Sequence, residues 1–569
     1  MTALLDYLQG NTDVGTPTLS VKDCKLLPGD HAWPKKDVWN AFNSSVDGRL
    51  IKTIPIGAAC HTDGFDEEKC QFVRDHWREP ELHLPSSSSV MDFIFANKSC
   101  DPFTDKEDQC VIGAYVQYSV NVTRPEHVMK TIEFVKNHDI RFVVRNTGHD
   151  YMGRSTGTGA VSVWMYHSQG MEWVDEYTSK TYSGPAVKVQ AGVMGYQIAE
   201  EAKKRGLVVV VGECPTVGFA GGYVQGGGHS FITNLYGLAA DQTLSFEVIT
   251  TDGRLVTASP TENKDLYWAL SGGGGGTYGV VWSVTIRAFP DLGATAAYLS
   301  FNSQGLSRQD WWSILSAWQR GTPNFTDQGI FVSTAYNFEW FQMAPLFAPN
   351  HTVESVTELM KPILSLLESN QYNIKYHFSI EYHQKTPVSS QEMNNMISEF
   401  QFGGRLLPRS LWESEEGFEA FMETVKVILE AGCDFIWDVA LRPTLAIAGY
   451  PDNAVHPAWR NAERMFNPTV FLDYRASIDT VIKNQDRISQ VYDEPLRQLT
   501  PEGGGAYMNE ADYTEPDWKD AFYGSNYDRL LAIKDKWDPD QILYGSIAVG
   551  GDRWQERKDG RLCRSKSSS

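Results

Sequence analysis

Five consecutive glycines, Gly272–Gly276, lie between a helix-like segment (263–272) and a strand-like segment (280–289). From Gly274 onward the letters match G-x-G-x-x-G, but the dinucleotide-binding fingerprint needs a strand before the glycines and a helix after them. Because the order is reversed here, the sequence argues against a Rossmann turn. The glycines therefore need another cause, and we expect close approach of this backbone to another backbone or to a ligand.

A second glycine-rich passage, GECPTVGFAGGYVQGGG, spans residues 212–228. Disorder is the alternative, but the apolar, strand-like segments on both sides predict that the passage is buried. Buried glycine-rich backbone offers many N–H donors at short range, which suits a diphosphate. No Walker-type G-K-[ST] is present, so a nucleotide hydrolase is disfavoured.

A third loop, RNTGHDYMGRS (145–155), follows the strand-like run IRFVVR and holds a His-Asp-Tyr trio between Gly148 and Gly153. Either His149 is an ordinary loop histidine, or the glycines let a flat ligand lie against the backbone with His149 pointing at it. We expect Asp150 to cap the loop through hydrogen bonds to backbone N–H groups.

Length and composition limit the classes of function. A chain of 569 residues is long enough for several domains, and 42% hydrophobic residues with 17 Trp can build large cores and aromatic-lined pockets. The formal net charge of -21 repels phosphates and anionic lipid headgroups, so we expect no nucleic-acid partner and no membrane partner. No apolar run approaches the roughly 18 residues of a membrane span.

Cysteines and sequons favour the secretory pathway, although no signal peptide is visible in MTALLDYLQGNTDVG at the N-terminus. The chain has eight cysteines, with close pairs at Cys60/Cys70 and Cys100/Cys110. Five N-x-[ST] sequons begin at Asn43, Asn97, Asn121, Asn324 and Asn350. The cysteines lack C-x-x-C spacing and H-E-x-x-H is absent, so we expect no metal site.

The pattern of residues changes along the chain. Residues 1–109 are irregular and predict an N-terminal extension stapled by disulfides. Residues 110–290 have an α+β texture, with helices predicted at 125–138 and 196–206, strands at 186–192 and 207–212, and a hairpin turn at Asp252-Gly253.

Residues 291–499 predict a second domain, an antiparallel sheet with helices on one side. Its strand candidates are 329–341, 372–383 and 434–449, and a helix is predicted at 307–319. Residues 500–569 are glycine-rich and polar, and they end with a helix, NYDRLLAIKDKW, that stops at Asp538-Pro539.

Five motifs in order resemble one family. RNTGHDYMGRSTG, GECPTVGFAGGYVQGGGHS, LYWALSGGGGGTYGVV, YMNEAD and FYGSNYDRLLAIK are similar to the FAD-linked oxidases of the berberine bridge enzyme-like group, within the vanillyl alcohol oxidase superfamily. The likeness extends over nearly the whole chain and is strongest to fungal members. It implies an α+β fold with a two-lobed FAD-binding domain (110–185 and 186–290, completed by 500–569) and the sheet of 291–499 over the flavin ring.

The resemblance implies two covalent bonds to FAD. His149 matches the histidine that bonds the flavin 8α-methyl carbon, and Cys214 matches the cysteine that bonds flavin C6. The chemistry is reasonable, because a neutral imidazole nitrogen can attack an electrophilic carbon and a deprotonated thiol is a good nucleophile. Arg145 is expected to supply positive charge that favours the thiolate and stabilises reduced flavin.

The resemblance also implies roles around the flavin. Tyr151 matches an active-site tyrosine and is expected to handle the substrate proton, for which its pKa must fall below the ordinary value near 10. His229 and Glu510 are expected to assist, although Glu510 can also be read as a solvated surface acid. Val217 matches a position that controls oxygen access, and valine there implies an oxidase.

The remaining residues expected to bind the cofactor come from the same loops and the C-terminal stretch. They are Asn146, Thr147, Gly148, Asp150, Gly153, Gly218, Gly222, Gly227, Gly228 and Asn526. Tyr507 and Asn509 lie in the same returning stretch.

Cysteine pairing follows once the flavin cysteine is set aside. A disulfide is the alternative for Cys214, and Cys433 is expected to be a buried thiol. Six cysteines then remain; proximity predicts Cys60–Cys70 and Cys100–Cys110, and elimination leaves Cys24–Cys563.

The implied reaction is oxidation of an alcohol-type substrate, with a hydride passing to flavin N5 and oxygen reduced to hydrogen peroxide. Fungal relatives suggest small alcohols, carbohydrates or alcohols of secondary metabolites, and the aromatic second domain favours an apolar or aromatic alcohol. The rivals are a carbohydrate oxidase acting at an anomeric hydroxyl, and a flavin-tethered redox or binding protein with little turnover.

Overall fold

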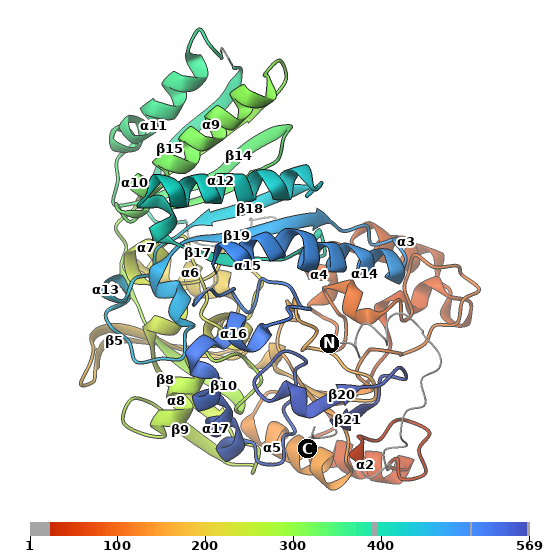
Figure 1. The fold of residues 1–569 in the computed structure, drawn as a ribbon. Coiled ribbons are helices and arrows are strands. Elements are labelled where there is room, and N and C mark those ends of the chain that lie inside the picture. Colours follow the sequence, from red (N-terminus) through yellow and green to blue (C-terminus); the bar gives the residue numbers. More distant parts are fainter. Residues whose placement is uncertain (1–22, 373, 388–395, 501–502, 566–569) are drawn as a thin grey trace.

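The computed structural model describes residues 23–372, 374–387, 396–500 and 503–565, which form three sheets of four or more strands and their covering helices (Figure 1). The N-terminal residues in which no signal peptide is visible lie outside the described residues. The predicted α+β fold class is confirmed, because mixed and antiparallel sheets alternate with helices along the chain.

The first sheet has four strands in the order β1-β2-β4-β3: β1 Leu50–Lys52, β2 Tyr118–Asn121, β4 Val161–Trp164 and β3 Phe142–Arg145. β4 runs parallel to both β2 and β3. The predicted helix is α5, Pro125–Asn137, with Pro125 in its first turn. Its residues Val128, Ile132 and Val135 share a core cluster with the valines of β4, so the helical period of the sequence places the helix on this sheet.

The second sheet has five strands in the order β5-β6-β10-β8-β9, all antiparallel: β5 Met171–Thr178, β6 Ser183–Gln190, β10 Val280–Arg287, β8 Thr243–Ile249 and β9 Leu255–Ala258. The predicted hairpin at Gly253 is confirmed, with φ of +82° at this glycine. The helices α6 (Gly195–Lys204) and α8 (Lys264–Leu270) also form where predicted. Because β10 follows α8 through the five glycines, the rejection of a Rossmann turn is confirmed.

The third sheet has eight strands, all antiparallel, in the order β15-β12-β14-β13-β18-β19-β16, with β17 also pairing with β19. The strands are β12 Ala294–Asn302, β13 Phe331–Tyr336, β14 Trp340–Pro349, β15 Tyr376–His383, β16 Phe400–Phe402, β17 Arg405–Pro408, β18 Phe435–Ala440 and β19 Ala462–Phe471. The helices α9 (Arg308–Gly321), α11 (Val353–Glu368), α12 (Glu415–Glu430) and α15 (Asp493–Leu499) share one core cluster with it (Figure 1).

Alternation along the strands of this sheet separates two environments. On β13, Val332 and Tyr336 pack among the helices, whereas Ser333 and Ala335 face a cavity on the opposite side. A strand presents successive side chains to opposite faces, so one face is free to line a site. The prediction of helices on one side of an antiparallel sheet is confirmed.

Three strand predictions need correction. The segment 329–341 is a hairpin of β13 and β14, because Asn337 turns the chain by accepting hydrogen bonds from the backbone N–H groups of Glu339 and Trp340. In 434–449 only the first half is a strand, and α13, Leu445–Ala448, follows behind a Thr444 cap. In 207–212 only Leu207–Val208 pairs with another strand; the valines beyond are buried without a ladder partner.

The predicted disulfides Cys60–Cys70, Cys100–Cys110 and Cys24–Cys563 are all present. Cys433 is buried outside them, as expected, and its thiol donates to the carbonyl of Phe435. Beside the Cys24–Cys563 disulfide, the Lys25 N–H donates to the Leu562 carbonyl at 2.8 Å. The disulfide and this backbone contact join residues 24–25 to residues 562–563.

The C-terminal part returns to the first sheet. The helix predicted there is α17, Tyr527–Trp537, and beyond it Leu543 bridges to Phe142 of β3 in parallel. None of the helices within the described ranges is both long enough and apolar enough to cross a bilayer.

The terminal disulfide is expected to contribute more stability than a local one. Cys563→Ser should lower the apparent melting temperature further than Cys70→Ser, because the Cys24–Cys563 bond closes a loop with a sequence separation of 539 and the Cys60–Cys70 bond one of 10. Loop entropy gives roughly 3 kcal/mol for the short loop and more for the long one. Differential scanning fluorimetry of both variants checks this order, and equal or reversed shifts would contradict it.

Candidate active site

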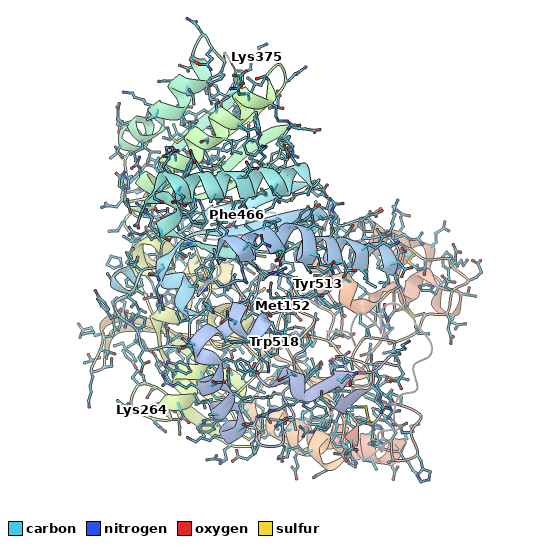
Figure 2. All side chains as sticks on the ribbon, in the orientation of Figure 1. Met152, Lys264, Lys375, Phe466, Tyr513 and Trp518 are labelled. Atoms are coloured by element: carbon cyan, nitrogen blue, oxygen red, sulfur yellow. A yellow bond between two sulfur atoms is a disulfide. The ribbon has the colours of Figure 1, made fainter. Side chains whose placement is uncertain are left out.

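A cavity of about 520 Å³ lies between the two glycine-rich loops and the eight-stranded sheet. The loops 146–155 and 212–222 form one wall, and β13, β14, β16 and β18 form the opposite wall. Figure 2 labels Met152, on the first loop, in the middle of the molecule beneath Phe466 of β19. The returning segments 507–510 and 543–545 complete the lining, so residues from distant parts of the chain build one site.

The two loops interlock through short polar contacts. The Gly218 N–H donates to Thr147 Oγ1 at 3.0 Å, and His149 Nε2 and Thr216 Oγ1 are hydrogen bonded at 2.7 Å. A Cβ on Gly218 would lie 2.4 Å from Asn146 Nδ2, so the Asn146 side chain, which donates to the Ala191 carbonyl, would have to shift. Glycine at 218 therefore lets the two loops meet with Asn146 in place, and the contacts between the loops hold His149.

His149 and Cys214 face the same cavity, with Nε2 and Sγ 4.0 Å apart. The alternative that Cys214 forms a disulfide is wrong. The three disulfides join six cysteines, and Cys214 is not among them. His149 is hydrogen bonded to Thr216 and also lines the cavity. Its ring is therefore held in position and remains accessible from the cavity.

The run Gly272–Gly276 packs against the second loop. The N–H groups of Gly272 and Gly274 both donate to the Gln225 carbonyl, at 3.1 and 2.8 Å. A Cβ on Gly275 would lie 3.1 Å from the Cα of Gly222. The expected close approach of one backbone to another is therefore confirmed, and Gly275 and Gly276 also line the cavity.

Carboxylates gather around His229 in the cavity. Its Nε2 lies 3.1 Å from Glu510, and its Nδ1 lies 4.0 Å from Glu213. Burial lowers the pKa of His229, but the Glu510 and Glu213 carboxylates together outweigh this effect and raise the pKa overall. Burial raises the pKa of Glu213 to about 7. Glu510 lines the cavity with a buried partner, so it is no freely solvated surface acid.

The pKa of Tyr151 is shifted in the direction opposite to the one that its expected role requires. This tyrosine lines the cavity and packs edge-on against Phe402 at 5.0 Å, but burial, with the negative charge of Cys214 and Glu510, raises its pKa rather than lowering it. A tyrosine in a desolvated, acidic environment keeps its proton at neutral pH. Its surroundings therefore do not provide the lowered pKa that a base role requires.

Several predicted site residues lie behind the cavity wall. Arg145 is fully buried and donates to the Ser86 and Ser89 carbonyls, which ties the loop to the N-terminal extension. Gly153 packs against Phe95, and Gly228 packs against Tyr223. Asn526 donates to the Ala454 and Val455 carbonyls instead of facing the cavity. The residues that do line it are Asn146, Thr147, Gly148, His149, Asp150, Tyr151, Cys214, Val217, Gly218, Gly222, His229 and Glu510.

The remaining predicted residues have structural contacts as well. Asp150 accepts hydrogen bonds from the backbone N–H groups of Met152 and Ser155, so the predicted loop cap is present. Gly227 has a φ of +122°, a conformation that favours glycine. Asn509 donates to the Gly222 carbonyl and to Tyr507 Oη, which joins the returning segment to the second loop.

Sequence reasoning missed the aromatic wall and two acids. The wall consists of Phe400, Phe402, Phe435 and Trp437, and the acids are Glu213 and Glu399. The period-2 alternation of FIWDVA on β18 could have indicated that Phe435 and Trp437 share a face. Nothing in the sequence says which face of the sheet meets the glycine loops.

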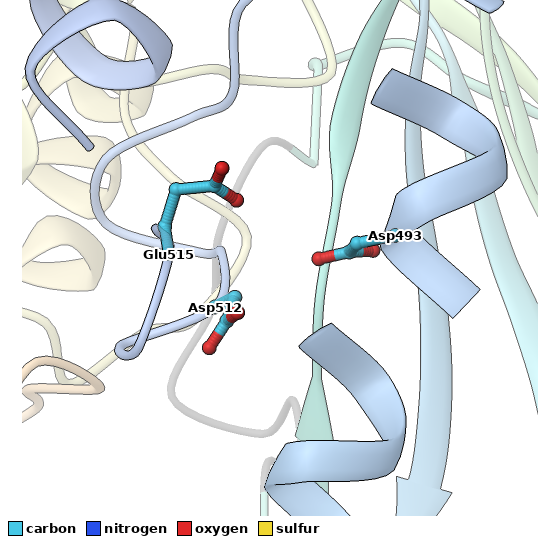
Figure 3. Close-up of side chains that lie close together, drawn as sticks. All are labelled: Asp493, Asp512 and Glu515. Carbon is cyan, nitrogen blue, oxygen red and sulfur yellow. The ribbon is translucent and has the colours of Figure 1, made fainter. Parts of the chain in front are cut away.

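A buried acidic cluster outside the cavity connects two parts of the fold. Asp493, Asp512 and Glu515 place oxygens within 4.8 Å of one another (Figure 3). Arg497 and Arg405 lie 3.4 and 3.8 Å from Glu515, and Asp512 accepts hydrogen bonds from nearby side chains. These contacts offset the negative charge of the cluster, and they connect α15 with residues 512–515.

Comparison with known proteins agrees with this geometry. Residues 116–259 match the FAD binding domain model, and residues 506–545 match the model for berberine and berberine-like proteins. The FAD-linked oxidoreductase patO of Aspergillus clavatus is 42% identical over 96% of this chain and 95% of its own length. The FAD-linked oxidoreductase ZEB1 of Gibberella zeae is 41% identical over 97% of this chain and 98% of its own length.

The chain is a berberine bridge enzyme-like, FAD-linked oxidoreductase. The crystal structure of the VAO-type flavoprotein MtVAO615 from Myceliophthora thermophila C1 supports this assignment, with a TM-score of 0.90, 34% identity, and coverage of 95% of this chain and 100% of that one.

The residues of this oxidoreductase fit FAD. The cavity is lined by backbone from the two glycine-rich loops, where close approach leaves room for a flat ring and N–H groups for phosphates. His149 and Cys214, which the resemblance pairs with flavin, lie at one end of the loops and face the same space.

The loop contact at Gly218 is expected to control FAD retention. Gly218→Ala should lower the melting temperature and the FAD content of this oxidoreductase, because the added Cβ displaces Asn146 and opens the loop junction. The matched control is Gly195→Ala, at the start of α6, where a Cβ meets nothing closer than 3.8 Å. Equal flavin-to-protein absorbance ratios in the two variants would contradict the prediction.

Proposed function

We propose that this oxidoreductase is an oxidase of an apolar or aromatic alcohol, with oxygen as the electron acceptor and hydrogen peroxide as the product. FAD bound in the cavity would accept the hydrogen of the substrate C–H bond as a hydride and pass the electrons to oxygen. The observation that carries the proposal is the position of His149 and Cys214, 4.0 Å apart, opposite an aromatic wall and beside the Glu510–His229 pair.

The wall favours an apolar substrate without negative charge. Four aromatic side chains of the sheet line the cavity, and the polar groups beside them on the sheet are few: Ser333 and Gln342. Glu213, Glu399 and Glu510 also line the cavity, and Arg154 is the one lysine or arginine among the described residues that line it. An anionic substrate would be repelled by these carboxylates, and a carbohydrate would find few hydrogen-bond partners on the sheet.

Proton transfer falls to Glu510 with His229. Glu510 lines the cavity and can accept the proton of a substrate hydroxyl, and His229 holds its carboxylate through Nε2 at 3.1 Å. Tyr151, which keeps its proton, can donate a hydrogen bond to the substrate oxygen. Val217 supports oxygen as the acceptor, because it lines the cavity close to Cys214 and matches the family position that controls oxygen access.

The chain is suited to the secretory pathway. It contains three disulfides, which persist in oxidising compartments, and the sequon residues Asn324 and Asn350 are exposed. These observations support the proposal that the oxidase is secreted or resides in that pathway.

Two covalent bonds to FAD are proposed, through His149 and Cys214. Denatured protein should keep a yellow, flavin-sized mass addition, and peptide mass spectrometry should find it on both residues. His149→Ala should leave attachment through Cys214 alone, and the double variant His149→Ala/Cys214→Ala should release all flavin on denaturation. Release of all flavin from the unmutated protein would contradict the tether.

A peroxide assay with a panel of substrates tests the function. Aromatic and apolar alcohols should yield hydrogen peroxide, and Glu510→Gln should slow anaerobic flavin reduction by about 10²–10⁴-fold, as expected for loss of an acid–base group. Substrate binding should weaken far less. Turnover of sugars alone would favour the carbohydrate oxidase. If no substrate reduced the flavin, the result would favour a flavin-tethered binding protein with little turnover.

A further inference from the structure

Glu213 is a cavity residue that the proposed function leaves without a role. It stands immediately before Cys214 and lines the cavity. Its Oε1 is buried and has no hydrogen-bond partner within the described ranges. The nearest charged group is the Nδ1 of His229, 4.0 Å away, which is likewise buried and without such a partner. A carboxylate oxygen and an imidazole nitrogen, each buried and each without a hydrogen-bond partner among the described residues, therefore face each other.

His229 is bracketed by carboxylates at both ring nitrogens. Nε2 lies 3.1 Å from Glu510, and Nδ1 faces Glu213 about 1 Å beyond hydrogen-bond length. A small rotation of Glu213, whose side chain is 24% exposed, can close that gap. Both nitrogens of a charged imidazole are donors, so this arrangement suits the imidazolium.

The charges that act on His229 come from carboxylates. Tyr507 packs edge-on against its ring at 5.5 Å, and the Tyr223 hydroxyl donates to its backbone carbonyl at 3.0 Å. The charged or titratable groups that act on Glu213 are His229, Glu510 and Cys214. No lysine or arginine contributes to either set, so among these groups only the imidazole of His229 can carry positive charge.

We propose that Glu213 is a positioning residue, which holds His229 in its charged form and receives the Nδ1 proton when Glu510 accepts the substrate hydroxyl proton. This inference rests on the proposed function, in which Glu510 is the proton acceptor. It extends that function by giving the proton a second buried position, away from the substrate.

The step moves protons only, and its balance is simple. At rest the trio has two carboxylates and one imidazolium, a net charge of −1. Glu510 forms an O–H bond as the substrate O–H bond breaks, and Glu510 then no longer stabilises the imidazolium. The Nδ1–H bond breaks and a Glu213 O–H bond forms, which leaves the trio neutral.

Electrostatics support this direction of transfer. Burial raises the pKa of Glu213 to about 7, so its carboxylate can take up a proton near neutral pH. Because Glu213 and His229 each shift the pKa of the other, these two groups titrate as a coupled pair and not as separate residues.

A spectral titration of the resting holoenzyme tests the proposal without any substrate. The visible absorbance of bound FAD reports charge in the cavity, and His229→Asn should abolish the step that belongs to the trio. Glu213→Gln should move the midpoint of that step down by about one pH unit or more, because the imidazolium loses one of two stabilising carboxylates. Glu213→Asp, which restores a carboxylate, should recover at least half of the shift.

Glu247→Gln on β8 is the matched control, because this glutamate pairs with Lys188 and Ser283 outside the cavity lining. An unchanged midpoint in Glu213→Gln would overturn the proposal. Loss of flavin attachment at Cys214 with an unchanged midpoint would overturn it too, and would assign Glu213 to the tethering step. Failure of every alcohol to reduce the flavin would instead reject the proposed function, and the titration would still report on the charge of the trio.

Discussion

The site depends on two glycine-rich loops that lie close enough to hydrogen bond to each other. Gly218 leaves room for Asn146, its N–H binds Thr147, and the neighbouring Thr216 binds His149. The five-glycine run then supports the second loop from behind, through Gln225 and Gly222. A Cβ at Gly218 would displace Asn146, and a Cβ at Gly275 would press against the Gly222 backbone, so these glycines serve close packing of the loops.

The eight-stranded sheet supplies the aromatic wall of the cavity, opposite the glycine-rich loops. Its helical face is a closed hydrophobic core, and that core lets the opposite face carry Phe435 and Trp437 into the cavity. The acids enter from other places: Glu510 from the returning C-terminal segment, and Glu213 from the loop itself. The acids and the aromatic wall therefore come from different parts of the chain, which agrees with the general rule that a fold holds a site without fixing its substrate.

The predictions made from sequence succeeded where the signal was local. The spacing of Val128, Ile132 and Val135 predicted α5, and the pairs of cysteines ten residues apart predicted two disulfides. The strand predictions at 329–341 and 434–449 failed because turn residues within them, Asn337 and Thr444, were outweighed by apolar neighbours. The role expected of Tyr151 stays a prediction, and the structure adds that burial beside carboxylates raises its pKa, a property that the sequence does not indicate.

The sequence alone determined the cofactor loops, the positions of His149 and Cys214, and the absence of a Rossmann turn, because glycine spacing and the order of helix and strand are local properties. The tertiary structure decided that Arg145 and Asn526 lie behind the wall, that Glu510 meets His229, and that Glu213 faces the same ring. These contacts join residues from distant parts of the chain. They arise only when the sheet closes over the loops, and no periodicity in the sequence encodes that approach.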